Sequence, residues 1–236
     1  MSEILCKGMG KESVVTDLCV KAADIQLPDI HEDDLVVIAM PVFAGRVPAL
    51  AVERLRKVNP HGAKCVVVAV YGNRAYDDAL LEIQDVASEI GFRVIAAVGA
   101  VAEHSIIRIY GKGRPDADDE QMLRQFGVDI MRKAEGSDCT MPQVPGHRPY
   151  KKGGMIPQPK GRRGCNRCGA CAKQCPADAI PLSDPKMVDS AKCISCMKCV
   201  SVCPTGARRI GTVMNFLATQ GLKKVCATRK ENELYI

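Results

Sequence analysis

Eight of the thirteen cysteines in this chain fall into two runs that share one spacing. In each run two residues separate the first three cysteines, and a fourth follows after three more residues and directly precedes a proline. The two runs are Cys165, Cys168, Cys171, Cys175 and Pro176, and Cys193, Cys196, Cys199, Cys203 and Pro204. Cysteines at this spacing are typical ligands of a pair of [4Fe-4S] clusters, which exchange single electrons. The residues therefore predict electron transfer.

The spacing also predicts which cysteines share a cluster. In two-cluster proteins of this kind the fourth cysteine of one run ligates the cluster of the other run, so neither run completes a site alone. The proline after each fourth cysteine restrains φ and lacks an N–H, which suits the start of a short helix. We expect one cluster to be bound by Cys165, Cys168, Cys171 and Cys203, and the other by Cys193, Cys196, Cys199 and Cys175.

A structural zinc ion and a set of disulfides are the alternatives for these cysteines. Tetrahedral zinc needs only two separated Cys-x2-Cys pairs, which leaves the third cysteine of each run and the proline unexplained. Disulfides fit less well, because the N-terminus MSEILCKGMG has no secretory signal and thirteen is an odd number. We therefore expect a reducing, cytoplasmic location. The five cysteines outside the runs are expected to be mostly small buried hydrophobic residues: Cys6, Cys19, Cys65, Cys139 and Cys226.

The chain is longer than a cluster domain requires. The runs and their flanks occupy about fifty residues, and the rest is enough for one further domain of ordinary size. No stretch of eighteen apolar residues is present, so no membrane span is expected. The net charge is +6, and basic residues gather around the runs. They predict either a solvated surface that offsets the charge of anionic clusters or a docking face for an acidic redox partner protein. Nucleic-acid binding is less expected, because the chain has no tryptophan and few aromatic residues for base stacking. The sequence does not indicate an oligomeric state.

The N-terminal half alternates between short apolar runs and helical patterns. Runs that are apolar throughout suit strands buried on both faces of a parallel sheet, and this alternation is typical of a doubly wound α/β domain. Asp77 or Asp78 is a candidate N-cap for the second helix, and Gly91 a candidate stop. The expected strands are residues 12–18, 34–40, 64–70 and 93–101, and the expected helices are residues 48–58, 77–91 and 118–133.

Two loops follow the expected strands at the sheet edge where such domains bind ligands. They are PVFAGRVP (41–48) and YGNRAYDD (71–78). A planar aromatic ligand would suit them, with Phe43, Tyr71 or Tyr76 stacking on its ring. Backbone groups near Gly45, Gly72 and Asn73 would then bind its edge. The alternative is that both loops are ordinary turns whose aromatic residues cover the sheet edge.

These segments carry a resemblance. The chain resembles a family of anaerobic bacteria in which a flavodoxin-like domain is fused to a dicluster ferredoxin domain. The resemblance lies in the two cysteine runs and in the stretches DLVVIAMPVFAGRVPAL, VVVAVYGNRAYDDALLE and GFRVIAAVGAVAEHS that precede them. The resemblance implies an α/β flavodoxin-like parallel sheet joined to an α+β bacterial-type dicluster ferredoxin domain. It also implies FMN across the strand ends. One flanking loop would be formed by Pro41, Phe43, Ala44 and Gly45, and the other by Tyr71, Gly72, Asn73 and Tyr76.

The chain departs from that family at its start. Flavodoxin-like domains open with a strand and a Ser/Thr/Gly-rich loop that binds the FMN phosphate. Here residues 1–10 are expected to be the last turns of the first helix, ending at Gly8 and Gly10, so the sheet is expected to lack its first strand. A late gene start, a split gene and a repacked domain would each explain this. We expect FMN to bind weakly if at all, because its phosphate would lack the N–H groups that anchor it.

The expected domain boundaries follow from these patterns. Residues 1–137 form the truncated flavodoxin-like domain, and 138–161 form a linker rich in proline, glycine and basic residues. Residues 162–211 form the ferredoxin domain with two [4Fe-4S] clusters, and 212–236 a C-terminal helix and tail. That helix is expected to turn Val213, Phe216 and Leu217 towards a packing surface between the two domains.

The chain is expected to be an iron–sulfur electron carrier that passes low-potential electrons, with the α/β domain as an FMN site or a docking surface. Whether it is also an enzyme is open, because no nucleophile–base pair or carboxylate constellation is present. One alternative is a flavin-dependent iron–sulfur oxidoreductase. The other is a redox-sensing or electron-donating subunit whose truncated sheet offers an edge to a partner strand.

Overall fold

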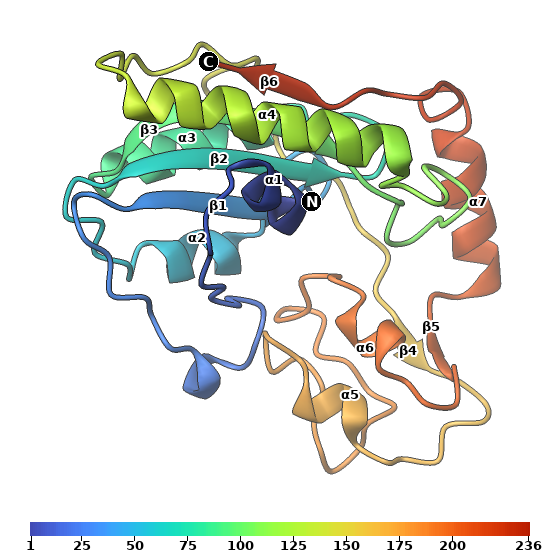
Figure 1. Cartoon of the computed structure of the whole chain (residues 1–236). Coiled ribbons are helices and arrows are strands. Elements are labelled where there is room, and N and C mark those ends of the chain that lie inside the picture. Colours follow the sequence, from blue (N-terminus) through green and yellow to red (C-terminus); the bar gives the residue numbers. More distant parts are fainter.

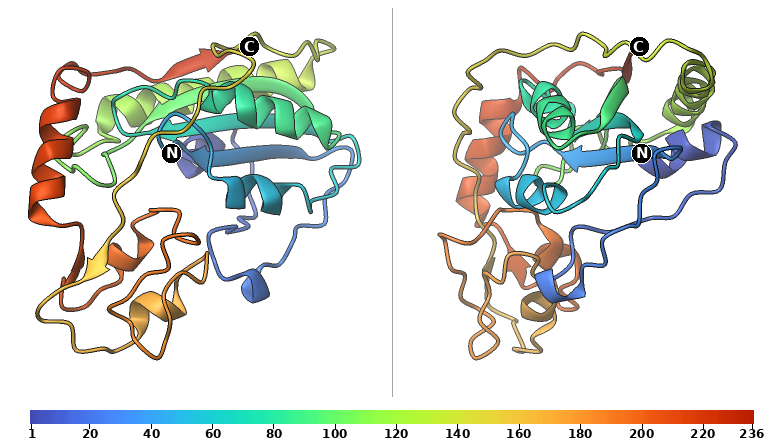
Figure 2. Two further views of the ribbon diagram at one scale, coloured as in Figure 1. Left: turned by 180° about the vertical axis from the view of Figure 1, so that it is seen from behind. Right: turned by 90° about the vertical axis from the view of Figure 1, so that its left-hand side faces the viewer.

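The computed structural model describes all 236 residues. Figure 1 shows two parts, an α/β part around a central sheet and a smaller part that carries the cysteine runs. Helix α7 (Thr212–Leu222) stands at one side and joins them. Figure 2 shows a long linker that crosses from the α/β part to the cluster part along the outside. No helix has the length and apolar character needed to cross a membrane.

The sheet is built on the expected apolar runs. Strands β1 (Leu35–Pro41), β2 (Lys64–Tyr71) and β3 (Arg93–Val101) are parallel, and β2 lies between the other two. Strand β6 (Glu233–Tyr235) pairs antiparallel with β3, which gives the order β1-β2-β3-β6. The strands expected near 34–40, 64–70 and 93–101 are therefore confirmed. The sheet is mixed rather than purely parallel, because the C-terminal tail returns to it.

The strand expected at 12–18 is wrong. These residues have no regular secondary structure, and the β-branched side chains Val14 and Val15 are 97% and 69% exposed. A β-branched run forms a strand only where a neighbouring strand can pair with it and a core can cover it. The segment instead descends towards the cluster part, where the short 3-10 helix η1 (Ala22–Asp24) follows (Figure 1).

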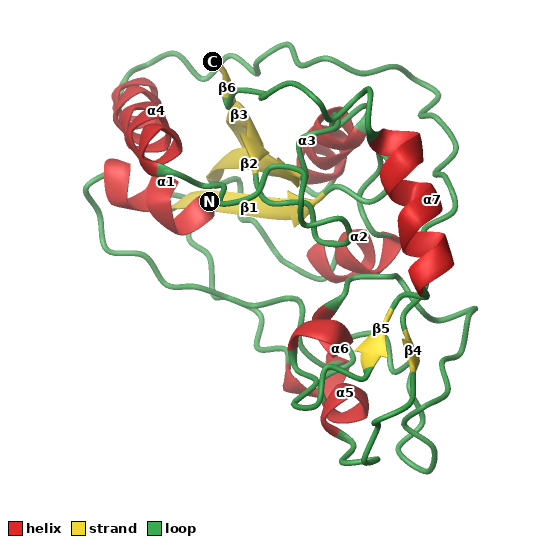
Figure 3. Ribbon diagram, turned by 90° about the vertical axis from the view of Figure 1, so that its right-hand side faces the viewer, coloured by secondary structure: helices red, strands yellow, loops and turns green.

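Helices cover both faces of the sheet. Alternate residues of β2 point to opposite sides, so Cys65 and Val67 pack with α2 (Ala49–Leu55) and α3 (Ala79–Glu89). Val66 and Val68 pack on the other face, against α1 (Ser2–Gly8) and α4 (Ala117–Glu135). Figure 3 shows this arrangement, with the helices on either side of the strands. The helices expected at 48–58, 77–91 and 118–133 are confirmed, as is the helix that ends at Gly8.

Two glycines allow α1 and α4 to cross closely. A Cβ on Gly8 would lie 2.2 Å from the carbonyl oxygen of Arg124, and one on Gly127 would lie 2.4 Å from that of Leu5. Any side chain at either position would therefore push the two helices apart. The backbone contact brings Leu5 and Leu123 into the core of this face, where both are almost fully buried.

The linker lies along α3 in an extended form. Asp78, the N-cap residue of α3, accepts N–H bonds from His147 (3.0 Å) and Lys151 (2.7 Å) instead of capping its own helix. Asp85, two turns further on, accepts from Arg148 and from the Tyr150 hydroxyl. The linker is therefore attached to the α/β part by two carboxylates.

Helix α7 is present, but its expected packing is wrong. Val213, Phe216 and Leu217 are 74%, 60% and 58% exposed. The helix packs instead through Ala218 and Leu222, against a small cluster formed by Ile107, Tyr110 and Cys226. The loop after β3 projects far enough to meet the opposite face of the helix, which the helical pattern alone does not reveal.

Candidate iron–sulfur centres

The two cysteine runs adopt the same local backbone. In each run the residues on either side of the second cysteine have positive φ: Arg167 (59°) and Gly169 (77°) in the first run, and Ser195 (55°) and Met197 (63°) in the second. These turns lead into the short helices α5 (Ala170–Lys173) and α6 (Lys198–Ser201). A chain that winds this tightly turns successive N–H groups inwards, where they can stabilise an anion.

The structure brings the eight cysteines together around two separate cavities. One cavity is lined by Cys165, Cys168, Cys171 and Cys203. The other is lined by Cys175, Cys193, Cys196 and Cys199. Each cavity thus takes its fourth cysteine from the other run, which is the arrangement that the spacing predicts. No three His, Cys, Asp or Glu side chains converge closely enough to hold a single metal ion.

The fourth cysteine of each run receives a backbone hydrogen bond. Ala179 N–H donates to Cys175 Sγ (3.3 Å), and Arg208 N–H donates to Cys203 Sγ (3.4 Å). Burial acts to raise the pKa of Cys203, but the Arg208 N–H and the nearby Thr205 outweigh it and the pKa is lowered. N–H···S bonds of this kind stabilise the thiolate form that iron requires.

A buried arginine lies between the two cavities. Arg208, on β5 (Arg208–Arg209), which pairs with β4 (Lys160–Gly161), lines both cavities and is 3% exposed. Its Nη1 donates to the carbonyl oxygens of Pro185 (2.7 Å), Lys186 (3.3 Å) and Met187 (3.1 Å). Its Nε and Nη2 are buried without a partner. A buried charged donor needs an anionic partner, so the site fits negatively charged clusters. The spacing of the cysteines contains no signal for this residue.

The second cavity faces the α/β part, and the first faces solvent. Arg54 of α2 is 3% exposed and donates from Nη2 to the carbonyl oxygen of Pro176 (2.7 Å), the residue after Cys175. By contrast, Cys168 in the first cavity is exposed.

The loops expected to flank a flavin lie side by side. Phe43 and Arg46 close a tight turn through mutual backbone hydrogen bonds, and Gly45 at its tip has a φ of +82°. A Cβ on Gly45 would lie 2.2 Å from the Asp77 carboxylate, so this turn touches the second loop. Gly72 in that loop is packed against His104 in the same way, because a Cβ on Gly72 would lie 2.7 Å from the Cα of His104.

The polar groups of the second loop bind the C-terminal tail. Asn73 donates from Nδ2 to the carbonyl oxygens of Cys226 (3.1 Å) and Thr228 (3.0 Å), and its Oδ1 accepts from Lys230 N–H (3.0 Å). Tyr76 is buried, and its hydroxyl bonds Glu233 (2.6 Å). An isoalloxazine ring would reach these side chains only after the tail had left, so in this structure they do not fit FMN.

Two aromatic rings complete this contact. The rings of Tyr71 and Tyr76 meet edge to face with centroids 5.2 Å apart, and the Tyr76 hydroxyl also lies 2.8 Å from that of Tyr235. Burial and the Glu233 carboxylate raise the pKa of Tyr76, so its phenol stays protonated.

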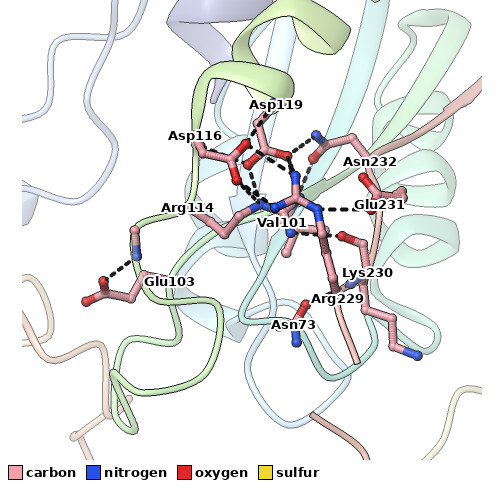
Figure 4. Close-up of polar contacts among 11 residues, drawn as sticks. Asn73, Val101, Glu103, Arg114, Asp116, Asp119, Arg229, Lys230, Glu231 and Asn232 are labelled. Atoms are coloured by element: carbon pink, nitrogen blue, oxygen red, sulfur yellow. Dashed lines mark hydrogen bonds and ion pairs between the residues drawn. The ribbon is translucent and has the colours of Figure 1, made fainter. Parts of the chain in front are cut away.

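A buried ion pair anchors the same tail (Figure 4). Arg114 forms a bidentate pair with Asp119, which is fully buried at the start of α4. Arg114 also donates to the Lys230 carbonyl (2.9 Å). Asn232 donates to Asp119 (2.8 Å) and accepts from Val101 N–H (2.8 Å) at the end of β3. The tail therefore completes the α/β part, although it follows the cysteine runs in sequence.

Comparison with known proteins places the cluster part in a family. Residues 164–207 match the family described as "4Fe-4S dicluster domain". The "Ferredoxin-like protein in nif region" of Sinorhizobium fredii (strain NBRC 101917 / NGR234) is 43% identical over 47 residues, which cover 17% of this chain and 73% of that protein. Through this segment the chain belongs to the ferredoxin-like 4Fe-4S dicluster family, and it is an iron–sulfur protein of the electron-carrier type.

The α/β part has a weaker match. Among solved structures, rubredoxin oxygen:oxidoreductase from the anaerobe Desulfovibrio gigas aligns with 43% of this chain and 23% of that chain, at 12% identity and a TM-score of 0.31. A TM-score of 0.31 is too low to establish a shared fold. This part is therefore described as a mixed sheet covered by helices.

Proposed function

We propose that this protein is an electron carrier that binds two [4Fe-4S] clusters, one in each cysteine-lined cavity. Cys165, Cys168, Cys171 and Cys203 would hold the first cluster, and Cys193, Cys196, Cys199 and Cys175 the second. The exchange of the fourth cysteine between the runs is the observation that carries this proposal. Clusters of this type supply reversible one-electron transfer at low potential.

Arg208 supports the same proposal from the protein side. Burial raises the pKa of Cys171 and of Cys199, and the Arg208 charge acts against that rise in both. One guanidinium therefore favours the thiolate form of a ligand in each cavity. It would also favour the added negative charge when either site is reduced.

External electron exchange is proposed to occur at the first cavity. Residues 160–211 contain ten lysines and arginines but only three acidic residues. The arginines close to the exposed Cys168 are themselves exposed, among them Arg163 and Arg167. A positive surface beside a solvent-facing site suits a redox partner with an acidic docking face, and it would make association depend on salt.

The α/β part is proposed to act as a platform rather than a flavin site. The flavodoxin-like relationship stays a prediction. The domain boundaries also stay predictions, with one revision, and they are 1–137, 138–161, 162–211 and 212–236. We assign residues 226–236 to the α/β part, because Asn73, Asp119 and β3 hold them there.

A second candidate is an electron-donating subunit of a larger complex. Strand β1 lies at the edge of the sheet, and its sequence LVVIAMP contains no charge. An uncharged edge strand can pair with a strand from another chain. Size measurement in solution with and without the physiological electron acceptor tests this candidate, and a protein that stays monomeric throughout would argue against it.

Iron and sulfide analysis after anaerobic purification tests the primary function. We expect about eight of each per chain, and reversible one-electron signals in voltammetry. A Cys175→Ser variant should lose the second site and a Cys203→Ser variant the first, whereas Cys139→Ser in the linker should keep both. A protein that contains zinc but no iron would contradict the proposal, as would an equal loss of iron and sulfide in all three variants.

A further inference from the structure

Residues 17–21, named the strap, run from the α/β part towards the cluster part (Figure 1). Lys198 of α6 donates to the Cys19 carbonyl oxygen in the strap (2.6 Å), and Lys21 pairs with Asp178. The residues on either side of Lys198 and of Asp178 line the second cavity, so the strap lies beside that site. The expectation that the cysteines outside the runs are mostly buried is wrong for Cys19, which is exposed on the strap.

Arg54 joins the strap to the cluster part. It lies in the last turn of α2 and is 3% exposed. Its Nη1 donates to the carbonyl oxygens of Leu18 and Val20 in the strap (2.9 Å to Val20), and its Nη2 donates to that of Pro176 (2.7 Å). Pro176 follows Cys175 and lines the second cavity. The guanidinium therefore lies directly outside this cavity.

No carboxylate neutralises the charge of Arg54. Its three acceptors are backbone carbonyls, which satisfy its donors but carry no charge. Arg56, two residues further on, is exposed and forms a bidentate pair with Glu89 (2.8 and 2.6 Å). A buried charge without a counter-ion acts more strongly on its surroundings than an exposed or paired one, because little water screens it.

The first cavity has no equivalent of Arg54. Pro204 takes the place of Pro176 in the second cysteine run, and it lines the first cavity. Pro204 is exposed, whereas Pro176 is buried beneath Arg54. The arginines near the first cavity, such as Arg167, are exposed, so water and salt screen their charge. The α/β part therefore brings a buried positive charge to the second cavity alone.

We propose that Arg54 raises the reduction potential of the second site and leaves that of the first site unchanged. The inference rests on the proposed function, because it takes the second cavity to hold a cluster. A cluster that accepts one electron from an external reductant gains one negative charge, and no bond forms or breaks. A buried positive charge nearby favours that reduced state. The α/β part would thus set the potential of one of the two sites.

The sign of the shift separates this role from a structural one. Loss of the Arg54 charge lowers the potential of the second site, because the reduced state loses its stabilisation. An interface that merely loosens admits water to the site. Water stabilises the more negative, reduced cluster and so raises the potential. The two roles therefore predict opposite shifts.

The test uses the holoprotein under argon. Iron and sulfide are measured first, and a value near eight separates a failure of the proposed function from a failure of this inference. Protein-film voltammetry then compares the native protein with Arg54→Gln. We expect one potential to fall by about a tenfold change in the reduction equilibrium, or about 59 mV, and the other to stay constant. The Cys175→Ser variant, which should keep only the first site, identifies the constant potential.

Three further variants serve as controls. Arg54→Lys keeps the charge but not the fork of hydrogen bonds, and it should hold the second potential near the native value even where Arg54→Gln fails to load. Asp178→Asn breaks the pair with Lys21 and loosens the interface, but it should not lower the potential. Arg56→Gln, on the same helix, should change neither potential.

Three results would overturn the proposal. One is an equal shift of both potentials in Arg54→Gln, and another is a rise of the second potential in that variant. The third is a fall of the second potential in Arg54→Lys or Asp178→Asn as large as that expected for Arg54→Gln.

Discussion

At the scale of single residues, Arg208 and Arg209 offer a direct comparison. They are neighbours on β5 and point to opposite sides, so Arg208 is buried between the cavities while Arg209 is exposed. A positive charge near a site that gains an electron raises its reduction potential, and the effect grows as solvent is excluded. The two residues carry the same charge in different surroundings.

We predict that Arg208→Met lowers the reduction potential of both sites by roughly 60 to 130 mV. A hydrogen bond to a charged group contributes about 1.5–3 kcal/mol, and 59 mV corresponds to a tenfold change for one electron. Protein-film voltammetry measures the shift. Arg208→Lys, which keeps the charge, should shift less, and Arg209→Met should leave the potentials nearly unchanged. Equal shifts in Arg208→Met and Arg209→Met would show that only the overall charge matters.

At the scale of elements, the crossing of α1 and α4 depends on the absence of a side chain. Gly127→Ala would place a Cβ 2.4 Å from the Leu5 carbonyl oxygen, so α1 must move away. We expect a loss of about 1–3 kcal/mol in the free energy of unfolding, as for other overpacked contacts. Urea denaturation under argon measures it. Gly221→Ala in α7, where a Cβ meets nothing within 4 Å, is the matched control and should be neutral or stabilising by up to about 1 kcal/mol.

The linker provides a second prediction at this scale. The pKa of Asp78 is lowered chiefly by the Lys151 N–H, with a further contribution from that of His147. A carboxyl with a lowered pKa contributes its full stabilisation above its ordinary pKa, near 4, and loses it as the pH falls through the lowered value. The native carboxylate is ionised throughout the range from pH 5 to 8. Asp78→Ala should therefore release the linker at any pH in that range.

Limited digestion with trypsin measures that release. Cleavage after Lys151 and Lys152 should be at least several-fold faster in Asp78→Ala than in the native protein. Asp33→Ala removes an exposed carboxylate that has no partner at the linker and should leave the rate unchanged. The idea that Asp78 holds the linker fails if both variants are cut at the native rate.

At the scale of the whole molecule, the tail decides what the α/β part can bind. Asn73 and Tyr76 hold residues 226–236 across the region that a flavin would need. We predict that titration with FMN, followed by quenching of flavin fluorescence, gives no saturation in the micromolar range. The Asn232→Ala variant removes the bridge between Val101 and Asp119, so its tail is held less firmly. Nanomolar binding by the native protein would show that the tail is no obstacle.

The sequence by itself determined the ligand chemistry. The cysteine spacing is a local property, because the first three cysteines of each run lie within seven residues of one another in the sequence and line one cavity, and the spacing also predicts the exchange of Cys175 and Cys203. The three parallel strands and the helices between them were also predictable, since a strand buried on both faces shows its burial in its own residues. The strand predicted around Val14 and Val15 was wrong, because the pattern of residues cannot show whether a neighbouring strand exists.

Only the tertiary structure decided what surrounds that chemistry. Arg208 between the cavities, Lys198 bound to the Cys19 carbonyl and Asn73 beneath the tail all depend on contacts between segments that are separated in the sequence. Lone arginines, cysteines and asparagines have many uses, and their types do not reveal which partner they will meet. Their roles arise from burial and charge in the folded chain, where a partner from another segment replaces the water that each group would otherwise bind.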